Sequence, residues 1–316
     1  MSAPIVTTSA GKPIQSQGSR WRQVFVITFG AVVLYVIARR LPTGTNLSHM
    51  DFRAGANSIE FCDPVNPQFM PVVAVRSPVE MTLTSNTPAV TGREVRVVAM
   101  LKTTTGKAIA PEDLRVVHTQ KLHLLVIDPT LTDYQHIHPQ PGNNAGEWVF
   151  TFTPRQAGQY RIFADFTPAA TARGLYANAD LVVASTPGFT AAVSPTKDNH
   201  TYEVNGFIFE LRPAEEPLRA GCVIDLTFAV SRRDKGLVPL QPVMGAYAHL
   251  VAFDNARSGF AHLHPFSTDL LRAPDSHEPR LAFKLTIPRA GRYVIWVQVK
   301  LDGREVFVPF WFVVLP

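Results

Sequence analysis

Hydrophobic and polar residues alternate in short runs over most of the chain. From residue 79 onward, runs rich in Val, Ile, Phe and Tyr are separated by turns that contain Gly, Pro, Asn or Asp. The runs recur about every 8 to 12 residues, a spacing typical of β-sandwiches. No stretch of this region keeps a 3.6-residue period, which an amphipathic helix would require. The pattern therefore predicts an all-β fold.

The beginning of the chain follows a different pattern. From residue 21 to residue 38 the only polar interruptions are Arg22, Gln23 and Thr28. A helix of this length would extend roughly 27 Å, close to the ~30 Å hydrocarbon core of a bilayer. We therefore expect a short tail at residues 1–20 and one membrane-spanning helix at residues 21–40.

The ends of this segment suit a membrane anchor. Aromatic rings favour the membrane interface and adjacent arginines stop a span. A cleaved signal peptide is the alternative, but no small-x-small site precedes Leu41, and the leader is long for the basic region of such a peptide. The basic, acid-free tail predicts a cytoplasmic N-terminus, with the bulk of the chain in the periplasm. The residues assigned to the anchor are Trp21, Phe25, Phe29, Tyr35, Arg39 and Arg40.

The remainder of the chain contains an internal repeat. The segment 150–160 resembles the segment 283–293, and both contain a proline-led Ala-Gly-x-Tyr corner. The alternating strands that precede these segments also match in the two halves, so two copies of one domain explain the pattern best. The sequence predicts an extended connector at residues 41–78, a first β-sandwich domain at residues 79–187 and a second at residues 188–316.

The strongest chemical signal is a histidine spacing that occurs once in each half. A His is followed by Asp at +5, by His at +13 and +15, and then by Pro. If the two segments pair as antiparallel strands, the first His lies opposite the last and the middle His shares their face. We expect two separate clusters, one in each domain. The candidate metal ligands are His123, His136 and His138 in the first domain and His249, His262 and His264 in the second.

At these motifs the sequence resembles a known group of proteins. An isolated His, a His-x-His-Pro motif and an Ala-Gly-x-Tyr corner, each present twice, are similar to the tandem Ig-like or cupredoxin-like extracytoplasmic domains of bacteria grouped with YtkA-like proteins. The resemblance implies copper binding and implies the six motif histidines as ligands. Neutral imidazoles suit Cu(II) or Zn(II), whereas the six methionines are not clustered as soft Cu(I) ligands would be.

A structural role is the alternative for the same histidines. Imidazoles can hydrogen-bond a hairpin turn, here through Asp128 and Asp254, and a duplicated domain repeats any device that it inherited. The remaining histidines lack partners at the repeated spacing, and we expect them at the surface or in loops. They are His49, His118, His200 and His277.

The two cysteines are too few for a disulfide framework. Cys222 alternates with Ile224, Leu226 and Phe228, which are expected to point inward from one strand. This alternation favours a buried core thiol over a disulfide between Cys222 and Cys62.

Composition excludes several functions. Charged residues make up 17% of the chain, below the roughly 25% of a typical globular protein. The net charge of +5 is scattered without a basic stripe, which argues against nucleic acid as a partner. No nucleophile elbow, phosphate loop, dinucleotide fingerprint or H-E-x-x-H motif is present, so we expect a protein that is not an enzyme.

Two functions remain. The favoured one is a structural subunit that stabilises a larger membrane complex, such as a photosynthetic reaction-centre or respiratory assembly, with the bilayer and other membrane subunits as partners. Both faces of the histidine hairpins are apolar, which in an antiparallel sheet requires a cover. The alternative is a periplasmic copper- or zinc-binding or metal-delivery protein that uses the three-histidine sites.

Overall fold

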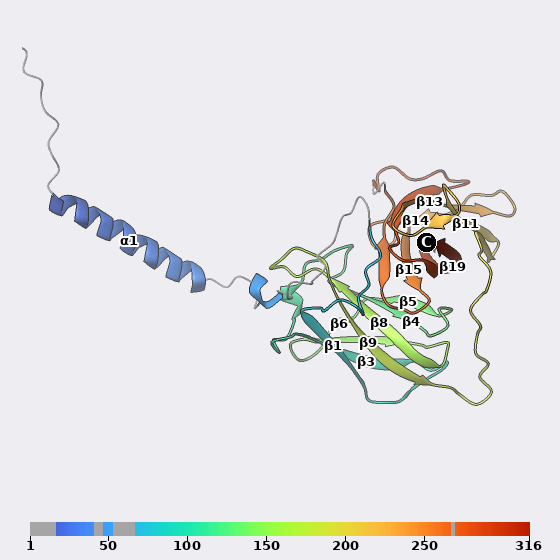
Figure 1. Cartoon of the computed structure of the whole chain (residues 1–316), viewed down its shortest axis with the longest axis horizontal. Helices are drawn as coiled ribbons and strands as arrows, with labels where there is room; N and C mark the ends of the chain where they lie inside the picture. Colours follow the sequence, from blue (N-terminus) through green and yellow to red (C-terminus); the bar gives the residue numbers. More distant parts are fainter. Residues whose placement is uncertain (1–16, 41–46, 53–66, 267–268) are drawn as a thin grey trace, which may run out of the picture. The chain divides into compact units, whose positions relative to one another are not determined.

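The computed structural model describes residues 17–40, 47–52, 67–266 and 269–316 (Figure 1). The chain divides into two compact units, one at residues 1–44 and one at residues 45–316. The first unit contains a helix and the second contains all of the strands, so the expected all-β fold is confirmed for the larger unit.

The helix α1 spans Gln17–Arg40, which includes the predicted segment 21–40. Its side chains from Trp21 to Ile37 are all exposed, and the rings of Phe25 and Phe29 stack 6.3 Å apart. Within the described part of the chain, no helix combines the length and the apolar character that a membrane crossing needs.

The first repeat consists of two sheets that share one core. In β3 the side chains alternate along the strand, with Val95, Val97, Ala99 and Leu101 buried, because only one face of its sheet packs against the other sheet. One sheet has the order β1 (Val79–Ser85), β3 (Val95–Thr103), β7 (Glu147–Phe152), β6 (Gln140–Pro141). The other has the order β2 (Ala89–Val90), β9 (Leu175–Ala184), β8 (Gly158–Phe166), β4 (Leu122–Ile127), β5 (Tyr134–Ile137). The strands of both sheets are antiparallel except for the parallel pair of β2 and β9.

The second repeat has the same construction. Its first sheet has the order β10 (Thr201–Val204), β11 (Phe207–Pro213), β13 (Val223–Arg232), β17 (Arg280–Thr286). Its second sheet has the order β12 (Leu218–Arg219), β19 (Arg304–Leu315), β18 (Gly291–Leu301), β15 (His249–Asp254), β16 (Phe260–Leu263), with β14 (Leu240–Gln241) also paired to β18. The strands β1, β3 and β7 correspond in order to β11, β13 and β17, and the second sheets also match, which confirms the duplication; the edge strands β6 and β10 have no counterparts.

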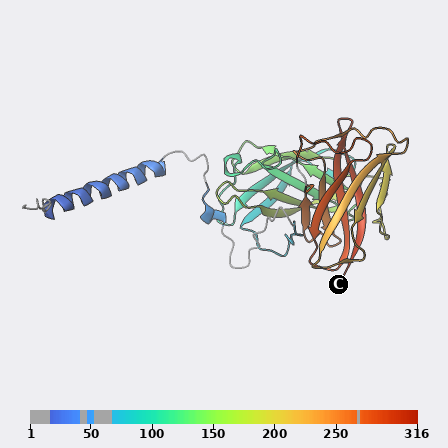
Figure 2. The same cartoon turned by 90° about the horizontal axis from the view of Figure 1, so that it is seen from above.

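The two repeats lie side by side (Figure 2). They pack together through the sheets that carry the histidine hairpins. Every residue of β4 is buried, because Leu124 and Val126 enter the core of the first repeat while Leu125 and Ile127 face the second. On the other side of the interface, β15 contributes alternate residues in the same way, including Phe253. The cover that the apolar hairpins require is therefore the other repeat, rather than a partner subunit.

The connector also contacts the second repeat, although it precedes the first in the sequence. Met70 and Phe260 exchange two backbone hydrogen bonds of 2.7 and 3.1 Å. A Cβ atom on Gly259 would lie only 1.8 Å from the carbonyl oxygen of Met70, so glycine is required for this close approach. Met70 of the connector thus pairs with the outer edge of β16. Residues 41–46 and 53–66 of the expected connector lie outside the described residues.

The expectation for Cys222 is wrong. Its side chain is exposed and unpaired, and it precedes the first residue of β13. Ile224, Leu226 and Phe228 are buried as expected, but the alternation does not continue back to a residue outside the strand. Cys62 lies outside the described residues.

Candidate metal centre

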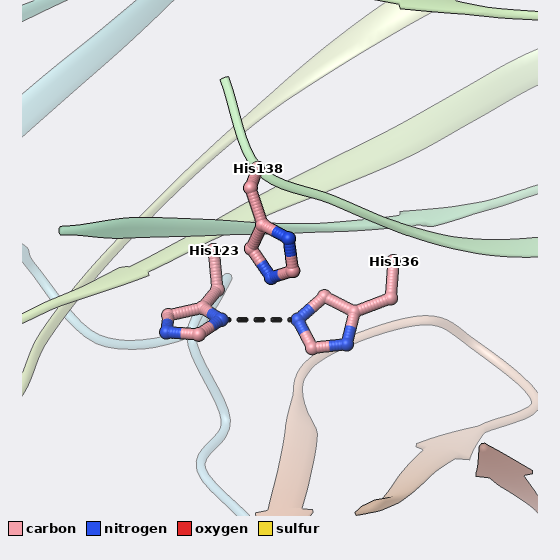
Figure 3. Close-up of side chains that lie close together, drawn as sticks. All are labelled: His123, His136 and His138. Carbon is pink, nitrogen blue, oxygen red and sulfur yellow. Dashed lines mark hydrogen bonds between the residues drawn. The ribbon is translucent and has the colours of Figure 1, made fainter. Parts of the chain in front are cut away.

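The first histidine triad lies at one end of the β4–β5 hairpin. Leu124 pairs with Ile137, a register that sets His123 opposite His138 and places His136 diagonally. The ring centroids of His123 lie 5.3 Å from His136 and 5.0 Å from His138. Figure 3 shows the three rings turned toward one another. The predicted convergence within the first domain is confirmed.

The second triad repeats this geometry on the β15–β16 hairpin. Leu250 pairs with Leu263, which sets His249 opposite His264. The ring centroid of His262 lies 5.7 Å from that of His249 and 4.8 Å from that of His264. In each triad, one nitrogen from every ring can be chosen so that all three lie within 4.8 Å of one another. Each triad could therefore hold a metal ion.

Hydrogen bonds on the outer side of the first triad define which nitrogens carry protons. The Nε2 atom of His123 donates to the carbonyl oxygen of Val117 at 3.1 Å. The Nδ1 atom of His136 donates to Oε1 of Gln298 at 2.8 Å. The amide nitrogen of Gln298 donates to Glu305 at 2.7 Å, and this bond fixes the amide so that its oxygen faces His136.

These tautomers place two lone pairs against each other. With protons on their outer nitrogens, His123 presents Nδ1 and His136 presents Nε2 as acceptors, and these atoms are 3.1 Å apart. Neither neutral ring can donate to the other without giving up its outer hydrogen bond. Two imidazoles on one tetrahedral Zn²⁺ have their nitrogens about 3.3 Å apart, given Zn–N bonds of about 2.0–2.1 Å. The observed spacing suits a shared cation.

In the second triad too, the outer ring nitrogens donate hydrogen bonds and the inner nitrogens are left as acceptors. The Nε2 atom of His249 donates to the carbonyl oxygen of Val243 at 2.9 Å, and Nδ1 of His262 donates to Asp165 at 3.0 Å. The inner nitrogens of both rings are buried and have no hydrogen-bond partner among the described residues. The Nε2 atoms of His138 and His264 are in the same condition. Buried acceptors without a protein partner are rare in proteins, and their convergence gives the triads a donor set that suits a cation.

Each domain carries its own triad, as expected, but the two triads lie side by side rather than apart. The ring of His262 lies 5.4 Å from that of His136 and 5.8 Å from that of His123. The ring of His249 lies 6.2 Å from that of His136. The hairpins meet because each belongs to the sheet that faces the other repeat. Six imidazoles therefore gather in the interface between the two domains.

Two positions that support the triads were missed in the sequence. Asp165 and Gln298 occupy equivalent places in β8 and β18, each five residues after the corner tyrosine of its repeat. Asp165 pairs with His123 along the sheet and Gln298 pairs with His249. The signal in the sequence was that Asp165 and Gln298 each interrupt an apolar run of their strand.

His118 was also misjudged. It lies in a loop as expected, but its ring stacks on that of His264 with centroids 3.6 Å apart. Its backbone φ of 48° equals that of Met244, which holds the same position in the other repeat. The fourth imidazole beside the second triad thus comes from the first domain. By contrast, His49 and His277 are exposed.

Burial lowers the pKa of all six triad histidines, because the charged form loses its hydration. The pKa of His249 falls to about 4. Burial also raises the pKa of Asp165, while the nearby His123 and His118 oppose that rise. The contact between His262 and Asp165 is therefore a hydrogen bond from a neutral ring. Neutral imidazole is the form that binds metal.

The structural alternative is wrong in its partners, because His123 and His249 hydrogen-bond the carbonyl oxygens of Val117 and Val243 rather than the turn aspartates. The carboxylate of Asp128 accepts backbone hydrogen bonds from Thr130, Thr132 and Asp133. The carboxylate of Asp254 accepts from Ser258. Both aspartates stabilise their own turns, and neither of these bonds involves a histidine.

The comparison with protein families covers both repeats. The chain matches the family described as "Domain of unknown function (DUF8832)" over residues 74–180 and again over residues 202–315, and it belongs to this family. No curated protein matches the chain. The resemblance to YtkA-like and cupredoxin-like domains stays a prediction.

Proposed function

We propose that this member of the DUF8832 family is a metal-binding protein that holds one Cu(II) or Zn(II) ion in each histidine triad. The observation that carries the proposal is the set of unsatisfied inner nitrogens, which converge while the outer nitrogens of His123, His136, His249 and His262 are held by hydrogen bonds. Metal-ligating histidines have this arrangement, because the outer bond fixes the tautomer and the ring orientation.

The donor chemistry selects the class of metal. Three neutral imidazoles favour Cu(II) or Zn(II), and among the described residues no cysteine belongs to either triad, as a thiolate site for Cu(I) would require. Three protein ligands leave a fourth position for water or another small ligand. The only carboxylate that hydrogen-bonds a triad imidazole in the described part of the chain is Asp165. Because Asp165 is engaged by His262, we keep the proposal to binding and delivery rather than catalysis.

Metal content tests this function. The full-length protein, exposed to Cu(II) or Zn(II) and then desalted, should retain close to two ions per chain by plasma mass spectrometry. The variant with His136→Ala, His138→Ala, His262→Ala and His264→Ala should retain none. His277→Ala, which changes an exposed histidine, is the matched control and should retain both ions. Equal metal content in all three proteins would contradict the proposal.

A second role, in attachment, is favoured by the helix α1. Its exposed side chains include Trp21, Phe25 and Phe29, and exposed apolar surface of this kind normally contacts a partner or a lipid surface. We propose that the N-terminus is cytoplasmic and that the two domains are periplasmic. We also propose that α1 contacts other membrane subunits or lipid. Deleting residues 1–44 should release the protein from the membrane fraction without changing its metal content. Unchanged fractionation would contradict attachment.

A further inference from the structure

In each triad, the middle histidine donates a hydrogen bond to a residue of the other domain. We call these two acceptor residues, Asp165 and Gln298, the supports of the triads. His136 of the first repeat donates to Gln298 of the second, and His262 of the second repeat donates to Asp165 of the first. Each triad thus takes its ligands from one domain and the partner of its middle ligand from the other. An ion in either triad would therefore depend on residues of both domains.

The crossed supports are not chemically equal. Asp165 presents a carboxylate directly to the ring of His262 at 3.0 Å. At the equivalent position, Gln298 presents an amide oxygen to His136, and its nearest acid is one step further away at Glu305. A carboxylate that accepts from a ligating imidazole raises the basicity of the ligand more than a neutral amide does. The difference between the repeats thus lies in the residues behind the ligands.

His118 adds a second difference between the triads. Its ring stacks on His264 and lies 6.0 Å from His249 and 6.4 Å from His262. The equivalent position in the other repeat is Met244, a thioether. The second triad therefore has an additional imidazole at its edge as well as the carboxylate behind it.

We propose that the two triads form one dinuclear centre that fills in a fixed order, with the triad of His249, His262 and His264 taking the first ion. This inference rests on the proposed metal-binding function. The first ion binds where Asp165 supports the ligand set. The second ion then enters the triad of His123, His136 and His138 against the charge of the first, because rings of the two triads are as little as 5.4 Å apart.

Stepwise titration of the full-length apo protein tests the order. Zn²⁺ is added in competition with a chromophoric chelator, and Co²⁺ absorption reports the ligand field in parallel. The unmodified protein should bind two ions in two resolved steps. His264→Ala should remove the tight step, and His138→Ala should remove the weak step.

Changes in the supports provide the sharper test. Asp165→Asn keeps the size of the side chain and its acceptor oxygen, and it should weaken the tight step by about 10- to 100-fold, the usual effect of removing an outer partner. The weak step should change little. Adding Gln298→Glu together with Glu305→Gln moves the carboxylate behind His136, and this triple variant should reverse the order, so that His138→Ala now removes the tight step.

The outcomes separate this inference from the proposed function. Two ions that bind with equal and independent affinity, or an Asp165→Asn variant with an unchanged tight step, would overturn the fixed order and leave metal binding intact. A total of only one ion per chain, lost on mutation of either triad, would show a single site shared by both triads and would overturn the dinuclear centre. No binding of Zn²⁺ or Co²⁺ would overturn the proposed function itself. Circular dichroism spectra and melting curves of every variant show whether a lost step reflects a lost fold.

Discussion

The interface between the repeats has an apolar end and a histidine end, and both lie on the same sheet faces. Along β4, Ile127 and Leu125 pack against the second repeat, and His123 continues the same face one step further. Along β15, Phe253, Val251 and His249 follow the same sequence. The apolar end consists mainly of packed side chains, with the buried hydroxyl of Tyr134 as an unpaired polar atom, whereas the histidine end has several buried nitrogens without a protein partner. The two ends therefore differ in the number and kind of buried atoms that they could offer to a ligand.

The largest effect is expected at the apolar end. Phe253 is fully buried, and its ring contacts Tyr134 at 5.5 Å and Phe163 at 6.0 Å between centroids. Phe253→Ala should lower the free energy of unfolding by about 3–5 kcal/mol, because the cavity cannot be filled from either sheet. Urea unfolding measures the loss. Val182→Ala, at a position that is 71% exposed, is the control and should change stability by less than about 0.5 kcal/mol. A small effect of Phe253→Ala would mean that the repeats are not held together here.

The next effect is expected from removing metal at the histidine end. An ion at 100 times its dissociation constant stabilises the folded state by about 2.7 kcal/mol for each site. Thermal unfolding of metal-loaded protein should therefore shift to lower temperature when a chelator is added. A variant with His136→Ala and His262→Ala should show no shift with chelator. An identical shift in that variant would place the effect of the chelator elsewhere.

The sequence predicted interactions between residues that are close in the chain, and it did not predict interactions between the two repeats. The hairpin register and the convergence of His123 with His136 and His138 follow from period-two alternation and a short loop, so the spacing alone was sufficient. Alternation also shows which residues share a face, but it does not show which faces of two sheets meet. The interface was therefore assigned to an outside partner.

The supporting residues illustrate the same limit. Asp165 and Gln298 bond histidines of the other repeat, 97 and 162 residues away in the sequence, and no local pattern predicts such a contact. His118 was set aside because it lacks a counterpart in the second repeat, although this asymmetry is what distinguishes the two triads. Cys222 was misplaced because the alternation was extended beyond the end of a strand.

A smaller effect is expected at the connector, which joins the interface from outside. Gly259→Ala would bring a Cβ atom against the carbonyl oxygen of Met70, and overpacking of this kind costs about 1–3 kcal/mol. The pairing of Met70 with Phe260 should open first, because it is an edge contact of few residues. Hydrogen exchange at the Met70 amide should accelerate while exchange within β15 stays slow. Unchanged exchange at Met70 would show that the connector accommodates the methyl group.

The smallest effect is the pH dependence that a single histidine adds at the histidine end without metal. Burial lowers the pKa of His249 to about 4, so the unfolded chain, with a pKa near 6.5, binds the proton more readily than the folded chain. Stability that is fully present above pH 6.5 is therefore lost as the pH falls toward 4. For His249 alone the loss between pH 6.5 and pH 5.5 is about 1 kcal/mol. Urea unfolding of chelator-treated protein at both pH values measures the loss from all the buried histidines, and the part that is absent in His249→Gln is the share of His249; His277→Ala should show the same slope as the unmodified protein. Stability that is flat over this interval would mean that the triad rings accept protons without opening the interface between the repeats.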